Sequence, residues 1–182
     1  MIVSSFHIEG PLLIEPKVYR DERGYFMESF HEERFTELTE IKHSFKQDNE
    51  SFSSKGVLRG LHFQVPPKAQ AKLVRVASGS VMDVIVDLRT SSPTFGQHLK
   101  VMLSGENKHQ LYIPEGFAHG FLTLQDNTLF CYKCSEFYHS ESEKSLKWDD
   151  PDLLIDWDYS DPIVSTKDQN AGLLADFNSP FE

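Results

Sequence analysis

Residues 57–64, Val-Leu-Arg-Gly-Leu-His-Phe-Gln, form an apolar stretch that carries an arginine, a histidine and a glutamine. In an extended chain the side chains alternate between two faces, so His62 and Gln64 point the same way. The stretch ends before Pro66 and Pro67, because proline cannot donate a hydrogen bond to a neighbouring strand. The sequence therefore predicts a buried strand with an inward-facing polar pair at its end.

Short extended runs separated by glycine or polar turns follow one another from Phe45 onward. They cover residues 57–64, 73–76, 81–88, 98–103, 111–116, 120–124 and 128–133, and residues 125–127 read as a hairpin turn between the last two. The fourteen Phe residues suit a pleated, half-buried interior. Short strands at this spacing predict an all-β sandwich or barrel, and 182 residues predict a single domain over 1–182.

The two ends of the chain are less regular. Residues 11–20 read as an edge strand with prolines, and a short helix follows, capped by Ser29 with Glu32 and burying Phe35 and Leu38 on one face. The C-terminal tail reads as irregular, apart from a brief helix near residues 167–174. A capping box formed by Ser165 and the residue three positions later would start that helix.

Charge is unevenly distributed along the chain. The net charge of −10 disfavours binding to nucleic acid or to an anionic membrane surface. Residues 55–100, however, hold seven Lys and Arg residues against only Asp83 and Asp87, so this segment carries +5 and the remainder −15. Such a basic segment suits a small anionic ligand, or it forms a solvated strand face.

Targeting and cysteine signals point to a reducing compartment. The N-terminus lacks the pattern of a secretory signal, and no apolar run approaches the length of a membrane span. Cys131 and Cys134 lie in a strand-like run, where positions i and i+3 face opposite sides. With no second cysteine pair to complete a zinc site, we expect free thiols in a cytoplasmic protein.

The motif Pro114-x-Gly116-x-x-His119 resembles the second signature of the cupin jelly roll, and His62 with Gly79 brackets the first. Metal-binding cupins carry a glutamate ligand seven positions before that glycine, and here the position is Lys72. An ammonium group has no lone pair to give a metal. The resemblance therefore implies a cupin-like barrel without a metal.

A longer set of motifs narrows the resemblance. The set comprises Gln47-Asp48-Asn49-x-Ser51-x-Ser53, residues 56–64, Lys72-Leu73-Val74, residues 87–96, Pro114-x-Gly116-Phe117-Ala118-His119-Gly120-Phe121, Tyr132-Lys133-x-x-x-x-Tyr138 and Ser165-x-Lys167-Asp168. Together these motifs resemble the dTDP-4-dehydrorhamnose 3,5-epimerases, and they run in order through nearly the whole chain. Phe52 departs from the pattern, because relatives commonly have a polar residue between the two serines.

This resemblance implies a fold, a reaction and an assembly. It implies an all-β, cupin-like jelly roll with a short N-terminal helix and a short C-terminal helical segment. It implies a cytoplasmic homodimer that needs no cofactor and no metal and that epimerises dTDP-4-keto-6-deoxy-D-glucose at C3 and C5, in dTDP-L-rhamnose and polysaccharide biosynthesis. The N-terminal residues of one subunit would reach into the partner's site.

The resemblance also implies catalytic roles. A hydrogen at C3 or C5 is acidic because the C4 ketone can hold the negative charge, and His62 is the expected base. Asp168 would hold the other nitrogen of the imidazole, and Lys72 would stabilise the enolate. Tyr132 would return the proton on the opposite face.

Binding roles follow in the same way. Arg23 and Arg59 suit the diphosphate, because guanidinium groups donate in pairs to such oxygens. Four further side chains suit polar groups of the nucleoside or sugar: Glu28, Gln47, Asn49 and His119. Phe26 would stack on thymine, whereas Tyr138, on one face with Tyr132 and Glu136, would either stack on a base or pack in the core.

Three alternatives stay open at the level of sequence. Enzymes that epimerise only C3 or only C5 of related nucleotide sugars share most of these motifs. A non-catalytic sugar-binding cupin would be expected to lack His62, Lys72 or Tyr132, all of which are present. A metal-dependent cupin enzyme would need ligands that this chain lacks.

Overall fold

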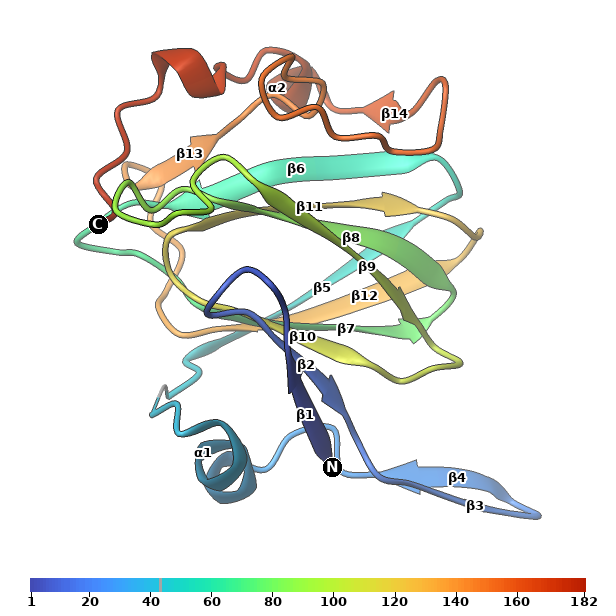
Figure 1. Cartoon of the computed structure of the whole chain (residues 1–182). Coiled ribbons are helices and arrows are strands. Elements are labelled where there is room, and N and C mark those ends of the chain that lie inside the picture. Colours follow the sequence, from blue (N-terminus) through green and yellow to red (C-terminus); the bar gives the residue numbers. More distant parts are fainter. Residues whose placement is uncertain (43) are drawn as a thin grey trace.

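Two antiparallel β-sheets pack face to face in the computed structural model, which describes residues 1–42 and 44–182 (Figure 1). The strand order of the first sheet is β1 (Ile2–Ser5), β2 (Leu12–Glu15), β10 (Gln110–Ile113), β7 (Lys72–Ser78), β12 (Thr128–Cys134) and β5 (Gln47–Ser53). That of the second is β13 (Glu143–Ser145), β6 (Val57–Gln64), β11 (Phe117–Thr123), β8 (Ser80–Asp87) and β9 (His98–Ser104), with β14 (Ile163–Val164) parallel to β6. The predicted all-β jelly roll is confirmed.

Successive strands often change sheets, which is where the sequence interpretation was wrong. Strands β11 and β12 lie in different sheets, so residues 124–127 connect the two layers and do not form a hairpin. The connection from β7 to β8 is Gly79 alone, with φ +80°. A Cβ at Gly79 would lie 2.2 Å from Thr128 Oγ1, so a side chain there would clash with β12. Strand runs can be read locally, whereas the choice of partner depends on the packing of the whole chain.

An apolar core fills the space between the sheets. Val74 and Phe130 from the first sheet meet Ile85 and Phe121 from the second, and the rings of Phe121 and Phe130 stack at 4.2 Å between centroids. Both rings also line the cavity described below. The core therefore forms one wall of the cavity and fixes its position between the layers.

The outer faces of both sheets are also covered. Helix α1 (Glu32–Thr39) packs Phe35 against Tyr112 on the first sheet, together with Phe30 and Phe45. The C-terminal chain crosses the second sheet and includes α2 (Thr166–Gln169) and the 3₁₀ turn η1 (Leu174–Asp176) (Figure 1). Its apolar side chains pack on the outward residues of β6, which are Leu58, Leu61 and Phe63. The packing side chains of the C-terminal chain are Leu153, Trp157, Phe177 and Phe181. None of the described helices is long and apolar enough to cross a membrane.

The N-terminal region differs from its prediction in detail. Residues 11–20 split into β2 and β3 (Val18–Asp21), and β2 is no edge strand because β1 pairs with its outer side. The helix is capped by His31, which accepts from the Arg34 N–H at 3.5 Å, and not by Ser29. Leu38 is exposed, so only Phe35 is buried. The helix therefore begins two residues later than expected, and it packs on the sheet through Phe35.

A bulge in β6 sets the direction of the polar side chains. His62 pairs with His119 and Arg59 pairs with Phe121 of β11. Two residues of β6 therefore lie opposite a single residue of β11, Gly120. One of the two is Gly60, with φ +127°, where a Cβ would lie 2.5 Å from the Cα of Gly120. The extra residue shifts the alternation and brings Arg59 to the same inner face as His62.

Candidate active site

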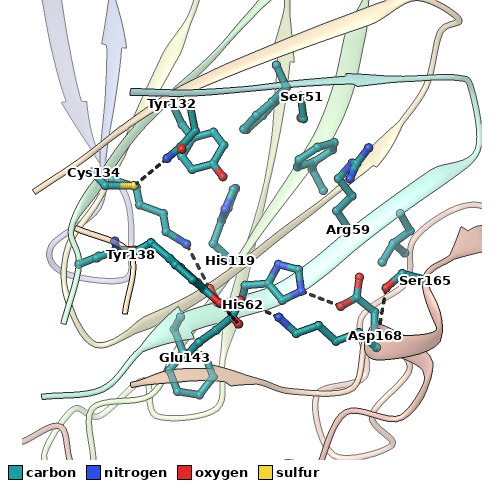
Figure 2. A pocket seen from close by; sticks show the side chains of 18 of the residues that line it. Ser51, Arg59, His62, His119, Tyr132, Cys134, Tyr138, Glu143, Ser165 and Asp168 are labelled. Atoms are coloured by element: carbon teal, nitrogen blue, oxygen red, sulfur yellow. Dashed lines mark hydrogen bonds and ion pairs between the residues drawn. The ribbon is translucent and has the colours of Figure 1, made fainter. Parts of the chain in front are cut away.

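A cavity of about 620 Å³ lies between the two sheets, and both layers contribute to its walls (Figure 2). The polar side chains that line it are Gln47, Asn49, Ser51, Lys72, Tyr132 and Cys134 from the first sheet and Arg59, His62, Gln64 and His119 from the second. Gln70, Tyr138, Glu143, Ser165, Lys167 and Asp168 complete the polar lining. Nine of the twelve residues expected at a site therefore lie around one cavity.

Strand β5 supplies part of one wall by simple alternation. Gln47, Asn49 and Ser51 line the cavity, while Asp48 and Glu50 are exposed on the other face. Gln47 Nε2 donates to Asn49 Oδ1 at 2.9 Å, which holds the two amides together. Gln47 and Asn49 thus both face the cavity, and their contacts with a nucleoside or sugar stay a prediction.

His62 is held by Asp168 from the C-terminal segment. Its Nε2 lies 2.6 Å from Asp168 Oδ1, and Asp168 Oδ2 accepts from the backbone N–H of Gly60 at 3.4 Å. Burial would raise the pKa of Asp168, but its hydrogen bonds, led by that from His62, lower the pKa below the usual value. An ionised Asp168 accepts a hydrogen bond from the Nε2–H of a neutral His62, which leaves Nδ1 of His62 as the proton acceptor.

Helix α2 places Asp168 for this contact. Ser165 caps the helix, because its Oγ accepts from the backbone N–H of Asp168 at 3.1 Å, as predicted. The helix ends at Gln169, earlier than expected. The Asp168 carboxylate accepts from His62 and from the Gly60 N–H, and not from the backbone N–H of Ser165 that a capping box would use.

Lys72 is buried beside the histidine strand. Its Nζ donates to the backbone carbonyl of His62 at 3.3 Å. Burial lowers the pKa of Lys72, while the neighbouring Cys134, Asp83 and Glu143 oppose that shift. In its ammonium form Lys72, with few protein partners, would be available to an oxyanion in the cavity.

A second histidine–carboxylate pair stands next to His62. His119 Nε2 lies 2.9 Å from Asp83 Oδ2, and both side chains are almost fully buried. Burial lowers the pKa of His119 and raises that of Asp83. Among the described residues, Asp83 Oδ1 has no hydrogen-bond partner. A neutral His119 donating to Asp83 would present its Nδ1 to the cavity as an acceptor.

Tyr132 faces these groups from the other sheet. It extends from β12, whereas His62 and His119 extend from β6 and β11 (Figure 2). Burial raises the pKa of Tyr132, and Arg59 opposes the shift only in part. The phenol therefore stays protonated at neutral pH and can act as a proton donor.

Charged and aromatic side chains surround the more exposed part of the cavity. Arg59 Nε donates to Ser53 Oγ at 3.1 Å. The Tyr138 hydroxyl donates to Glu143 at 3.0 Å, and Lys167 pairs with the same carboxylate at 2.6 Å. Glu143 was missed by sequence reasoning, and Lys167 was only a motif position. Nothing in the sequence around Glu143 distinguishes it from the other acids of residues 136–143.

Three residues expected at the site lie elsewhere in this chain. Arg23 and Phe26 belong to the hairpin formed by β3 and β4 (Gly24–Met27), which projects from the body, and Glu28 follows it (Figure 1). The Arg23 side chain is 85% exposed and pairs with Asp21, Phe26 is 66% exposed, and Glu28 pairs with Arg34. None of the three lines the cavity.

Two expectations about the strand that carries Tyr132 have different outcomes. Cys131 and Cys134 are free and face opposite sides, as predicted, with Cys134 in the cavity. Glu136, expected on the face of Tyr132, instead pairs with Lys46. The strand ends at Cys134, so alternation no longer applies beyond it. In the described part of the chain, no three His, Cys, Asp or Glu side chains are placed to hold a metal ion.

Epimerisation next to a ketone needs a base, an acid on the other face of the carbon and a charge that stabilises the enolate. The walls of this jelly-roll cavity carry candidates for all three, which is the equipment of a carbohydrate epimerase, an isomerase. The family model for dTDP-4-dehydrorhamnose 3,5-epimerase matches residues 5–176, and the chain belongs to this family.

Individual relatives agree with the family model. A dTDP-4-dehydrorhamnose 3,5-epimerase from Shigella flexneri is 51% identical over 176 residues, which cover 97% of both chains. The crystal structure of the dTDP-4-dehydrorhamnose 3,5-epimerase from Elizabethkingia anophelis superposes with a TM-score of 0.92 at 51% identity, covering 97% of each chain. A Legionella pneumophila dTDP-6-deoxy-D-glucose-3,5-epimerase in complex with dTDP-4-keto-L-rhamnose superposes with a TM-score of 0.94 at 50% identity, covering 97% of this chain and 94% of that one.

Proposed function

We propose that the protein converts dTDP-4-keto-6-deoxy-D-glucose into dTDP-4-keto-L-rhamnose by inverting C3 and C5, a step of dTDP-L-rhamnose biosynthesis. The observation that carries this proposal is the pair His62–Asp168 on one wall of the cavity with Tyr132 on the opposite wall. The Legionella relative was crystallised with the product named here.

The reaction begins with proton removal. Nδ1 of His62 takes the proton from C3 or C5, and Asp168 stabilises the imidazolium that forms. The electron pair of the C–H bond moves towards the C4 ketone, whose oxygen becomes an enolate. Lys72 stabilises that charge, and such a donor is typically worth about 3 to 4 kcal/mol in the transition state.

Inversion requires a proton from the other side. Tyr132 lies on the wall opposite His62 and donates its phenolic proton to the same carbon. Its raised pKa keeps the phenol protonated at neutral pH. The tyrosinate regains a proton from solvent, and the imidazolium loses one, before the second centre reacts.

The nucleotide part of the substrate occupies the outer part of the cavity. Arg59 binds the diphosphate, and Lys167 adds a second cation at the cavity. Tyr138 stacks on the thymine base. Gln47, Asn49 and His119 bind polar groups of the nucleoside or sugar.

The remaining site residues come from a second subunit. We infer a homodimer in which the β3–β4 hairpin brings Arg23, Phe26 and Glu28 to the partner's cavity. The exposure of Phe26 and the projection of the hairpin support this arrangement. We further propose that residues 1–182 form one domain, that the enzyme needs no cofactor or metal, and that it works in the cytoplasm.

Product identity tests the proposed reaction. The protein is incubated with dTDP-4-keto-6-deoxy-D-glucose, and NMR follows the configuration at C3 and C5. We expect dTDP-4-keto-L-rhamnose, inverted at both centres. A product inverted at one centre only would indicate a single-centre epimerase, and binding without any product would indicate a sugar-binding protein.

A further inference from the structure

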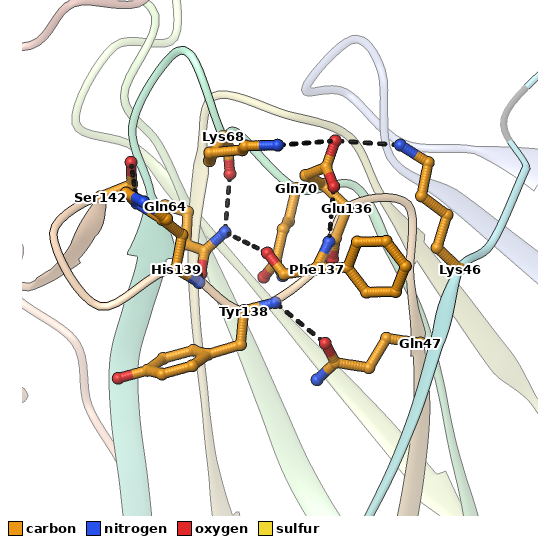
Figure 3. Close-up of polar contacts among 10 residues, drawn as sticks. All are labelled: Lys46, Gln47, Gln64, Lys68, Gln70, Glu136, Phe137, Tyr138, His139 and Ser142. Carbon is orange, nitrogen blue, oxygen red and sulfur yellow. Dashed lines mark hydrogen bonds and ion pairs between the residues drawn. The ribbon is translucent and has the colours of Figure 1, made fainter.

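Residues 135–142 form an irregular connection between β12 and β13 that carries Tyr138. The Tyr138 ring lines the cavity although 57% of this residue is exposed. An exposed aromatic ring on an irregular segment needs other contacts to hold its position. In this segment several backbone groups are bound by side chains of distant strands (Figure 3).

Gln64 holds the backbone on both sides of Tyr138. Its Oε1 accepts from the His139 N–H at 2.7 Å, and its Nε2 donates to the Phe137 carbonyl at 3.2 Å. The same Nε2 donates to the Lys68 carbonyl at 2.7 Å. Gln64 is only 4% exposed, and both of its amide hydrogens are used within the protein. Its polar groups are thus committed to the segment and not to a ligand.

Neighbouring contacts complete this support. Gln47 Oε1 accepts from the backbone N–H of Tyr138 at 2.9 Å. Glu136 Oε1 accepts from the Phe137 N–H at 2.8 Å, and Lys46 lies 2.9 Å from the same carboxylate. Side chains therefore bind backbone groups of residues 137–139, and one of these side chains, Glu136, belongs to the segment itself.

We propose that Gln64 is a positioning residue that fixes Tyr138 for stacking on the nucleotide base. It follows His62 by two positions on β6, so one strand sets both the proton acceptor and the base-stacking ring. Holding the segment in advance reduces the ordering that binding would otherwise require. This inference rests on the proposed stacking role of Tyr138.

Calorimetric titration with dTDP alone tests the positioning role without depending on epimerisation. Tyr138→Ala should weaken binding roughly tenfold, since base–aromatic stacking contributes on that scale. Gln64→Met, which removes all three hydrogen bonds at similar volume, should weaken binding by roughly fivefold. In the double variant the Gln64 change should add nothing further, because it acts through the ring. Gln64→Glu keeps the side-chain shape but loses both donors, and should weaken binding in the same direction.

Thr128→Val is the matched control. Thr128 lies at the other end of β12, is fully buried, and bonds the Gln125 carbonyl and the Ser80 N–H. Its loss should lower the melting temperature without changing the dTDP affinity. A second measurement uses the wild type without ligand. Its His139 N–H, which donates to Gln64, should exchange slowly with deuterated water.

The outcomes separate two failures. Unchanged affinity in Tyr138→Ala would refute the stacking role within the proposed function. Weakened binding in Tyr138→Ala with unchanged affinity in the Gln64 variants, an additive double variant, or rapid exchange of the His139 amide would overturn the positioning role itself.

Discussion

Burial sets the protonation of the cavity at the scale of single residues. It keeps Tyr132 protonated and lowers the pKa of His119 and of Lys72. Asp168 has the opposite environment, because hydrogen bonds outweigh burial and keep it ionised beside His62. The acid and the base of the proposed reaction therefore differ in their surroundings and not only in residue type.

Tyr132→Phe should separate proton removal from inversion. The base and the lysine remain, so the variant should still exchange substrate protons with deuterated water. The opposite-face donor is absent, so net inversion should fall by about 10²-fold to 10⁴-fold, the usual contribution of a general acid. NMR measures both quantities in one sample. Equal loss of exchange and inversion would make Tyr132 a packing residue.

The residue types with the clearest chemistry could be predicted from sequence. The family resemblance assigned His62, Lys72, Tyr132 and Asp168 as base, cation, acid and carboxylate, and these four side chains meet at one cavity. Asp83 was not recognised as a partner of His119, although the two lie on adjacent strands. The contact between them depends on strand pairing, which a single sequence does not specify.

At the scale of elements, alternation was informative where the strands are regular. On β12 it correctly placed Cys131 and Cys134 on opposite faces. Alternation alone would place Arg59 and His62 on opposite faces of β6, and the bulge in this strand brings both side chains inward. The sheet partners of β11 and β12 were wrong because local turn residues do not reveal a change of sheet.

The β3–β4 hairpin gives a prediction at this scale. If it serves the partner's cavity, two inactive variants should restore activity when mixed: His62→Asn, which lacks the base, and Phe26→Asp, which disrupts the hairpin. A mixed dimer has one cavity with an intact base and an intact hairpin. We expect up to about a quarter of wild-type activity after mixing under conditions that allow subunit exchange, the share that random pairing of two subunits gives.

Each variant incubated alone is the control for subunit exchange. If the hairpin acts within its own subunit, no mixed dimer contains an intact site and the mixture stays inactive. Analytical ultracentrifugation of the wild type measures the assembly itself, and a monomer would contradict the proposed dimer.

Over the whole molecule, charge distribution agrees with an anionic substrate. Of the basic residues within 55–100, Arg59 and Lys72 line the cavity, and Lys167 joins them from the C-terminal segment. The remainder of the chain is strongly acidic. Positive charge within a cavity of an acidic protein concentrates a nucleotide diphosphate there and disfavours larger polyanions.

The central claim is that His62 removes the proton at both C3 and C5. Its most direct test is deuterium incorporation into dTDP-4-keto-6-deoxy-D-glucose in deuterated water, followed separately at the two centres for the wild type and for His62→Asn. Asparagine is similar in shape but accepts no proton at neutral pH, so substrate binding should persist. The wild type should exchange both centres, and His62→Asn should lose both by at least about 10²-fold. Exchange that survives at either centre in His62→Asn would contradict the account and would make His119 the first candidate for the base.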